Sequence, residues 1–475
     1  MAYPQSYFPG VINEDLAKKF GGSLRSFEFI PILPPMHGSA LLNYYTSSIG
    51  SYGDWAMAYS LFIYKGSLMA LVGVLPSGLY DVLEGKWVWV ENRSWYESMG
   101  GAVVDPDTET VAWASNDTPY VFIYDGSTVK MINLGENTGG NIVRGSDGNF
   151  YVYGNSGSLY QVTPSGNVTK VSTNPNSQGG GSWFAENLGG TLFFASPYPD
   201  YSIYAYNPSN ASWTVAMQGT TAQSGIGYDV VQVATWDTLA ALAIMNWPLP
   251  PERLLGFITF QGSSLVTNVY GILPWVTTSG DIWNISAQPL ILDETQTVCN
   301  VGGILWLIGH PDYSWNEGPP GVRPLGGFFI FNSGITWKGD IYLGTKPLLM
   351  SYRGGSLNSD IQRFGGVIRL RADELFKLQL PAAKAVLWNN TSISAGQNSP
   401  PLVTMGWSEV TISFTSNTSG NLTVYVDPVG DGTWEAYATY SSITSQIFTI
   451  RDHFARVMLS FSAAATVTAK ALLVP

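Results

Sequence analysis

The chain has 475 residues, of which 12% are charged, 13% are aromatic and one is a cysteine. Its formal net charge of -12 argues against a nucleic-acid partner, which needs a basic surface, and against binding to an anionic membrane. The single cysteine, Cys299, excludes an intramolecular disulfide and is expected to be a small buried hydrophobic residue. With three scattered histidines, neither a zinc site nor another cofactor site is expected.

After an N-terminal arm, residues 1–26, a pattern of four short apolar runs recurs about every forty residues. The pattern is clearest over residues 139–172, in the runs Asn141–Arg144, Phe150–Tyr153, Leu159–Thr163 and Val168–Val171. Turns rich in Gly, Asn, Asp and Pro separate these runs, which predicts an antiparallel meander. A four-stranded meander repeated at this period predicts the blades of a β-propeller.

Similar units begin near Gly53, Gly100, Gly180, Gly225 and Gly280, and a last set of strands lies around Lys346–Tyr352 and Gly366–Leu380. We therefore predict a propeller of about six blades over residues 27–380, with five or seven allowed. An array of β-sandwiches is the alternative. We expect Phe27–Leu33 to complete the last blade, and only Asn13–Phe20 has helical spacing.

The C-terminal part has a different spacing of apolar runs. Residues 389–401 are rich in Asn, Ser, Thr, Gly and Pro, which predicts a linker or long loop. Longer alternating runs follow: Val410–Thr415, Leu422–Asp427, Trp434–Thr439, Ile447–Ile450, Ala455–Phe461 and Thr466–Leu473, with Asp427–Thr433 as a hairpin loop. This pattern predicts a β-sandwich of jelly-roll type over residues 381–475. The fold class is therefore all-β.

Composition also predicts an exposed location. The sequence contains nine acceptor motifs for N-glycosylation, at Asn92, Asn116, Asn167, Asn210, Asn284, Asn389, Asn390, Asn417 and Asn421. The beginning of the chain has no basic segment followed by an apolar one, and no apolar run is long enough to span a membrane. A virion component reconciles these observations, because it leaves the cell with the particle. A mature secreted chain, or a polar β protein that is simply rich in Asn, Ser and Thr, is the alternative.

Two segments resemble known families. Residues 146–153, SDGNFYVY, and 156–169, SGSLYQVTPSGNVT, are similar to propeller repeats of the NHL and gluconolactonase-like kind. Residues 422–437, LTVYVDPVGDGTWEAY, resemble β-sandwich modules of viral tail and spike proteins and, more loosely, discoidin-like carbohydrate-binding sandwiches. The metal-binding carboxylates of lactonase-like propellers cannot be placed on this sequence, so that activity is not carried over.

The whole chain resembles structural proteins of viruses that infect thermophilic archaea. This resemblance implies a tail, spike or turret component on the virion exterior. Its partners would be other virion proteins, further copies of itself, and a glycan or glycoprotein of the host surface. A hub whose propeller only mediates subunit packing is a further possibility.

An enzyme is the main alternative from another class. A glycoside hydrolase needs two carboxylates across a cleft, and the candidates near blade starts are Asp54, Asp105, Asp107, Asp147, Glu186 and Asp229. A sialidase-like propeller also needs an arginine cluster, but the available arginines show no pattern: Arg144, Arg323, Arg353, Arg363, Arg369 and Arg371. Aspartates are also ordinary turn residues. We therefore predict a non-enzymatic protein, with a glycan-active hydrolase or a cell-surface lectin as the alternative.

Aromatic residues are the better candidates for ligand contact. Tyr198, Tyr201, Tyr313 and Trp315 lie in segments rich in Pro, Gly and Ser, where exposed rings could stack on sugars. Tryptophans within apolar runs are expected to belong to the blade core instead: Trp87, Trp89, Trp113 and Trp183.

Overall fold

The computed structural model describes residues 27–32, 57–73, 77–91, 99–116, 118–177, 179, 181–182, 184–196, 202–217, 227–236, 239–247, 253–261, 264–276, 290–292, 296–309, 322–327, 331–345, 366–376 and 378–475. Within these residues the structure is almost entirely β-strand, and the one helix is α3, Ala372–Leu375. The all-β prediction is confirmed. The N-terminal arm and the helix expected at Asn13–Phe20 lie outside the described residues.

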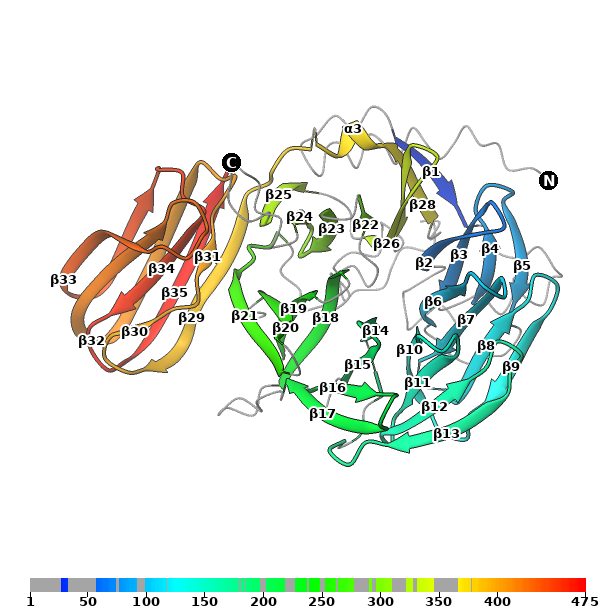
Figure 1. Ribbon diagram of the computed structural model, residues 1–475. Coiled ribbons are helices and arrows are strands. Elements are labelled where there is room, and N and C mark those ends of the chain that lie inside the picture. Colours follow the sequence, from blue (N-terminus) through cyan, green and yellow to red (C-terminus); the bar gives the residue numbers. More distant parts are fainter. Residues whose placement is uncertain are drawn as a thin grey trace, which may run out of the picture.

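Four-stranded antiparallel sheets stand around a ring in chain order (Figure 1). The first three blades are β2 (Met57–Tyr64), β3 (Ser67–Gly73), β4 (Gly78–Asp81), β5 (Lys86–Val90); β6 (Met99–Asp105), β7 (Thr110–Ser115), β8 (Tyr120–Tyr124), β9 (Val129–Asn133); and β10 (Thr138–Arg144), β11 (Phe150–Gly154), β12 (Ser158–Val162), β13 (Val168–Thr173). The next two are β14 (Phe184–Leu188), β15 (Thr191–Ser196), β16 (Ser202–Asn207), β17 (Ser212–Met217); and β18 (Gly227–Trp236), β19 (Leu239–Trp247), β20 (Arg253–Gln261), β21 (Ser264–Ile272).

The ring continues with β22 (Leu290–Ile291), β23 (Gln296–Val301), β24 (Ile304–Gly309), β25 (Val322–Gly327), and then with β26 (Phe331–Trp337), β27 (Asp340–Thr345) and β28 (Gly366–Arg371). Six of the sheets in the described residues are separate four-stranded sheets. The meander β18–β21 is a further four-stranded unit, which one parallel bridge joins to the C-terminal strands. The β-propeller prediction is confirmed, and the blade count falls within the predicted range.

The N-terminal strand closes the ring. β1 (Phe27–Pro31) pairs antiparallel with β28, from Phe27 opposite Leu370 to Pro31 opposite Gly366. This confirms the expectation that Phe27–Leu33 completes the last blade. Because the two ends of the propeller share one sheet, the ring leaves only short blade edges that could pair with other chains.

The glycine pairs at blade starts have a packing reason. A Cβ on Gly139 would lie 2.0 Å from the backbone nitrogen of Ser182 in the next blade. Gly181 has φ +68°, and a Cβ there would lie 2.3 Å from Oδ1 of Asn155. Glycine is therefore required where neighbouring blades approach each other most closely.

Aromatic side chains fill the space between blades. Trp113 stacks on Phe122 with ring centroids 5.3 Å apart, and Trp89 lies 5.2 Å from the same ring. Trp87 packs edge-on against Tyr80 at 5.3 Å. These contacts confirm that Trp87, Trp89 and Trp113 belong to the blade core, whereas Trp183 lies outside the described residues.

The C-terminal region is a sandwich built around two long strands. Its strands are β29 (Ala383–Ile393), β30 (Gln397–Asn398), β31 (Leu402–Val403), β32 (Glu409–Asp427), β33 (Glu435–Ile450), β34 (Arg456–Phe461) and β35 (Ala465–Val474). The first half of β32 pairs with β35 and its second half with β34, so one strand runs through both layers. β33 follows β32 along both halves, and the predicted hairpin loop joins the two strands.

The linker predicted over residues 389–401 is wrong. Asn389 and Asn390 lie inside β29, where the pairing with β35 slips between Trp388 and Thr391. Both asparagines are exposed, and Asn390 has φ +51°. A bulge at a solvent-facing position therefore explains the polar sequence.

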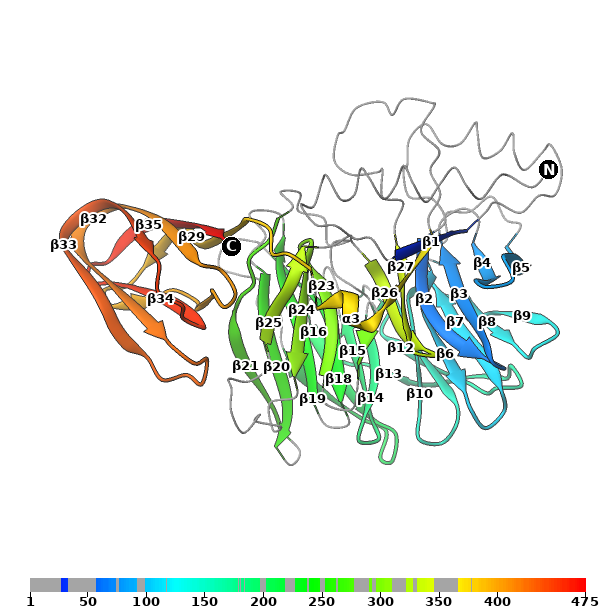
Figure 2. The same cartoon turned by 90° about the horizontal axis from the view of Figure 1, so that it is seen from above.

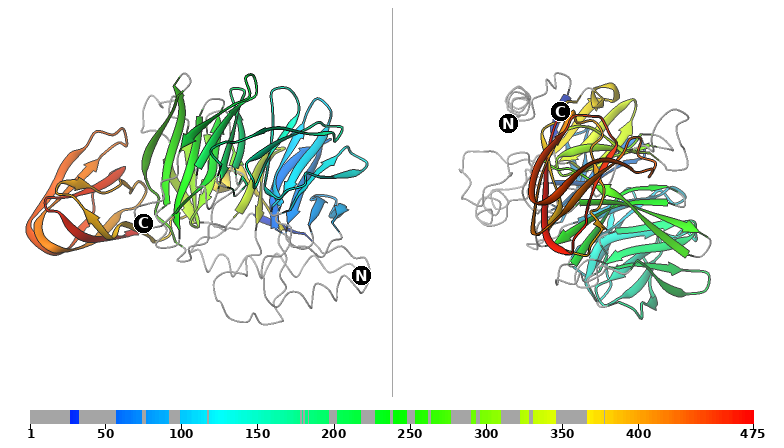
Figure 3. Two further views of the ribbon diagram at one scale, coloured as in Figure 1. Left: turned by 90° about the horizontal axis from the view of Figure 1, so that it is seen from below. Right: turned by 90° about the vertical axis from the view of Figure 1, so that its left-hand side faces the viewer.

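The C-terminal region packs against the side of the ring beside β21 and β25 (Figures 2 and 3). Its core is continuous with that of the propeller, because Trp306 of β24 contacts Trp407 with ring centroids 5.9 Å apart. Trp275 and Lys384 exchange two backbone hydrogen bonds of 2.9 and 2.8 Å. The two parts therefore share a buried, hydrogen-bonded boundary.

Candidate functional site

The ring has two faces that differ in their connections. The first strand of each blade is the innermost, and the first strands of neighbouring blades contact one another. We call the face where these strands begin the start face, and the face where they end the end face. In a four-stranded meander the second-to-third connection lies on the start face, together with the connections between blades. The first-to-second and third-to-fourth connections lie on the end face.

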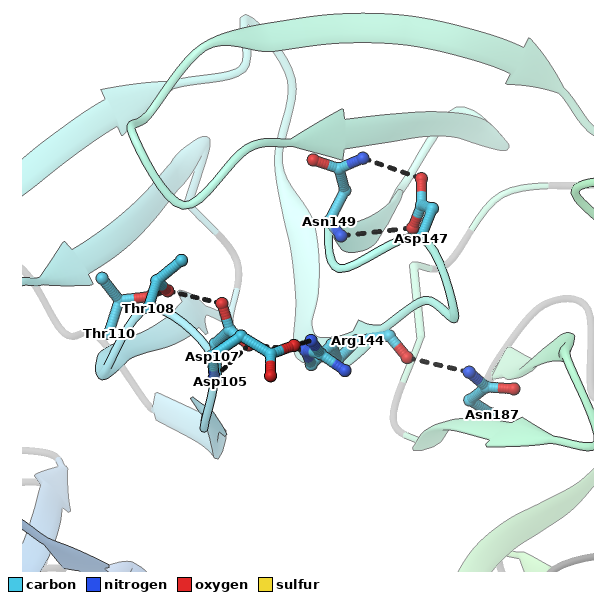
Figure 4. A network of polar contacts seen from close by, with 8 residues as sticks. All are labelled: Asp105, Asp107, Thr108, Thr110, Arg144, Asp147, Asn149 and Asn187. Carbon is cyan, nitrogen blue, oxygen red and sulfur yellow. Dashed lines mark hydrogen bonds and ion pairs between the residues drawn. The ribbon is translucent and has the colours of Figure 1, made fainter.

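A polar network lies on the end face at the second, third and fourth blades (Figure 4). Arg144, at the end of β10, donates from Nε to Oδ1 of the buried Asp105 at 2.8 Å, and from Nη2 to Asp107. Asn187 of β14 donates from Nδ2 to the carbonyl oxygen of Arg144 at 3.0 Å. The network thus joins three consecutive blades at the ends of their inner strands.

Asp147 forms a second cluster beside this network. Its carboxylate accepts hydrogen bonds from the backbone of Asn149 at 3.1 Å, the hydroxyl of Tyr151 at 2.9 Å and Nε2 of Gln161 at 2.8 Å. Burial and the hydrogen bond to Asp147 raise the pKa of Tyr151 to about 12. This phenol therefore remains a hydrogen-bond donor at neutral pH.

The electrostatics of these carboxylates suit a structural role. The same holds for Glu136, between β9 and β10, whose carboxylate accepts hydrogen bonds from Ser156 and Tyr160. Burial acts to raise the pKa values of Asp105, Asp147 and Glu136, but the hydrogen bonds that each receives outweigh it, and all three pKa values are lowered. A glycosidase acid needs the opposite, a raised pKa. The three groups are therefore ionised acceptors that hold turns and blades together.

Only some of the other candidate hydrolase residues lie among the described residues. Glu186 lies in β14, and Asp54 and the side chain of Asp229 lie outside the described residues. Arg369, on the last blade, is held by Asp340 and Glu28, just as Arg144 is held by its own two carboxylates. Arg323 and Arg371 lie in β25 and β28, and Arg353 and Arg363 lie outside the described residues.

The aromatic residues predicted to bind a ligand also lie outside the described residues. Tyr198 and Tyr201 fall between β15 and β16, and Tyr313 and Trp315 between β24 and β25. The strand ends that flank the first pair lie on the start face, and those that flank the second lie on the end face. The described strand ends on either side of the two pairs therefore lie on opposite faces of the ring. Counting the strands from each blade start in the sequence would have predicted that the two aromatic pairs follow strand ends on opposite faces.

The two faces also differ in the length of chain between strands. The segments that join β1 to β2, β17 to β18, β21 to β22 and β27 to β28 all leave from the start face. On the end face, two glycines at 189–190 join β14 to β15 and Gly145–Asn149 join β10 to β11, but the segment from β24 to β25, residues 310–321, is longer than the segment from β17 to β18. Long connections on one side of a rigid scaffold are a common location of binding residues.

Most described glycosylation motifs are exposed. These are the motifs at Asn167, Asn210, Asn389, Asn390, Asn417 and Asn421. Asn116 is half-buried and forms backbone bridges to Thr138 and Gly139. Asn92 and Asn284 lie outside the described residues.

Cys299 is fully buried, as predicted, and burial raises the pKa of its thiol. In the part of the chain that the structure describes, no three His, Cys, Asp or Glu side chains gather as a metal site would require. No helix among the same residues has the length and apolarity needed to cross a bilayer.

Sheets closed into a ring by an N-terminal strand define a β-propeller, here with a C-terminal sandwich. No protein-family model matches the chain, and no curated protein matches it. Solved structures similar to it include U3-55K (10% identity, 73% of this chain, 99% of that chain, TM-score 0.44) and the WD40 repeats of RRP9 (9%, 73%, 98%, 0.46). Another is the extracellular domain of a putative hybrid two-component system from B. thetaiotaomicron (13%, 94%, 59%, 0.45).

Proposed function

We propose that this protein is a non-enzymatic attachment protein on the exterior of a virus particle, a tail, spike or turret component. In this proposal the propeller binds a glycan or glycoprotein of the host surface, and the C-terminal region contacts other particle proteins or further copies of the chain. The resemblance noted in the sequence suggests a virus of thermophilic archaea and propeller repeats of the NHL or gluconolactonase-like kind.

The observation that supports this proposal most is the asymmetry of the two faces. The end face of the second to fourth blades is held by Asp105, Arg144 and Asn187, which already bond to one another. The start face carries most of the long connections between strands, and the end face carries one, between β24 and β25. A ligand that binds without chemistry needs variable loops on a rigid ring, and the start face offers them.

Two further observations agree with the proposal. Six glycosylation motifs are solvent-exposed, which leaves room for attached sugars. The carboxylates with lowered pKa values, such as Asp105 and Asp147, suit hydrogen-bond acceptance and not proton donation. The first observation agrees with an exposed location, and the second favours binding over hydrolysis of a glycan.

The experiment compares the two candidate aromatic pairs. The purified chain is tested on a glycan array and on host cells, as wild type, Tyr198→Ala, Tyr201→Ala and Trp315→Ala. We expect the two start-face tyrosine variants to lose about 1–3 kcal/mol of binding free energy each, through loss of an aromatic contact surface. Trp315→Ala is the matched comparison, because its flanking strands end on the opposite face.

The thermal stability of each variant separates contact from folding. Removing an exposed aromatic ring should change the free energy of unfolding by about 0.5 kcal/mol or less. Unchanged binding in both tyrosine variants would contradict a start-face site, and loss of binding only in Trp315→Ala would move the site to the end face. Release of sugar from the array would favour the hydrolase.

A further inference from the structure

β33 is an edge strand of unusual length and composition. It has 16 residues and, within the fully described C-terminal region, pairs only with β32. It lies on the side of that region farthest from the propeller (Figure 1). Its outer edge therefore presents unpaired backbone donors and acceptors in a direction that the ring does not cover.

This edge lacks the residues that usually protect one. From Ala436 to Ile450 the strand contains no charged residue and no proline. The outermost strands of the first three blades each carry a lysine, Lys86, Lys130 and Lys170, and β1 carries both a glutamate and a proline. Charge and proline on an edge oppose pairing with another chain. These four propeller edges are thus protected, whereas β17 (Ser212–Met217) and β33 lack both charge and proline over most of their length.

The C-terminal half of β33 has an apolar side chain at its centre. Ile447 is 67% exposed, more than any other large hydrophobic side chain in the described residues. Its neighbours Phe448 and Ile450 are buried in the sandwich core and hold the strand in place. The segment Ile443–Ile450 is β-prone, uncharged and free of proline and glycine, the composition typical of strands that pair between chains.

We propose that β33 pairs with β33 of a second copy of this chain, antiparallel about a two-fold axis at Ile447. Residues directly opposite each other in an antiparallel pair point to the same face of the sheet. An axis at Ile447 therefore places Ile447 against its own copy and Ser445 against Thr449 of the other copy. The two sandwich sheets join into one continuous sheet.

A second copy fits this edge better than a charged partner. A two-fold contact places the residue on the axis against its own copy, so a charge at or beside the axis would lie close to a like charge. With the axis at Ile447, residues 444–450 of the two copies face one another, and none of them is charged. This inference needs no ligand, so its test does not depend on the proposed attachment function.

The test measures self-association of the full chain by analytical ultracentrifugation over a range of concentrations. The variants are Ile447→Glu, Ile447→Lys, their equimolar mixture, and Leu472→Glu. Leu472 is the matched control, because it is 44% exposed on the same face of the same sheet but lies in β35, an inner strand.

We expect the wild type and Leu472→Glu to dimerise equally. Each Ile447 variant alone should dimerise on the order of tenfold more weakly, because like charges meet at the axis. Mixing Ile447→Glu with Ile447→Lys should restore the dimer, which a folding defect could not do. A monomeric wild type, a dimer unaffected by either charge, or a mixture that stays monomeric would each overturn the proposal.

Discussion

Arg456 of the C-terminal sandwich donates a 2.9 Å hydrogen bond from Nη1 to the carbonyl oxygen of Tyr270, the residue two positions before the end of β21 in the propeller. The same guanidinium lies 4.5 Å from the Tyr270 ring centroid and bonds to the buried Asp427. Asp427 in turn accepts from the backbone of Gly430 and Gly432. One buried ion pair thus holds both the β32–β33 turn and the boundary between the two parts of the molecule.

Replacing Arg456 should therefore destabilise the C-terminal region strongly. Arg456→Ala leaves the carboxylate of Asp427 buried without its cation, which costs about 3–5 kcal/mol of unfolding free energy. Arg451→Ala is the matched control, because Arg451 pairs with Glu409 at the surface, where such a pair contributes about 0–1 kcal/mol. Urea unfolding of both variants gives the comparison, and equal losses would contradict the role given to Arg456.

The junction between the second and third blades offers a second test. Arg144→Ala removes two charge-assisted hydrogen bonds and leaves Asp105 buried, so we expect a loss of about 2–3 kcal/mol. Lys65→Ala breaks the exposed pair with Glu109 and should cost less than about 1 kcal/mol. A loss from Arg144→Ala no larger than that from Lys65→Ala, in chemical denaturation, would show that the network does not hold the blades.

The ion pair of Asp105 and Arg144 also predicts that stability depends on pH. Burial acts to raise the pKa of Asp105, but hydrogen bonds from Thr108, Asp107 and Arg144 lower it overall. A lowered folded-state pKa gives stability that is complete above the ordinary aspartate value, about 4, and is lost as the pH falls through the folded value. The stability difference between wild type and Arg144→Ala should therefore narrow below a pH of about 4. Calorimetry across this range checks it, and a constant difference would argue against the ion pair as its source.

Close contact between inner strands predicts an asymmetry between two glycines of the repeat. Gly139→Ala places a Cβ against the backbone of Ser182 and should cost about 3 kcal/mol or more. Gly101→Ala, in the glycine pair that begins the preceding blade, meets nothing nearer than 3.8 Å and should cost about 1 kcal/mol or less. The melting temperatures of the two variants test this difference. Similar values for both would show that the blades can separate to accept the methyl group.

We expect the acceptor asparagines that are exposed to solvent to carry sugar, and buried ones to stay unmodified. Asn210 lies in an exposed turn, where its Oδ1 accepts hydrogen bonds from the backbone and hydroxyl of Ser212, and Asn167 lies in a similar turn. We expect both to carry sugar in native material, whereas the half-buried Asn116 stays unmodified. Peptide mapping by mass spectrometry checks this. Sugar on Asn116 with Asn210 bare would reverse the expectation.

Local turn chemistry made much of the fold predictable. The predicted run Phe150–Tyr153 differs from β11 by one residue, because Asp147 and Gly148 mark the preceding turn unambiguously. The strands β26 and β27 were not predicted, although Lys338 and Gly339 form a two-residue turn between alternating runs.

Long-range pairing could not be predicted in the same way. Residues 416–421, SNTSGN, look like a turn, yet they continue β32 because β33 and β35 pair with that strand on either side. The ion pair of Asp105 and Arg144 joins residues 39 positions apart, and neither residue signals its partner in the sequence. Both features depend on tertiary contacts, which override the conformation that the local sequence favours.

The most direct test of the account is a density map of the native particle that carries this chain. The account predicts the propeller on the particle exterior, with its start face directed outward and the C-terminal sandwich toward the particle. A chain located in the particle interior, or a start face covered by neighbouring subunits in the mature particle, would contradict the attachment function.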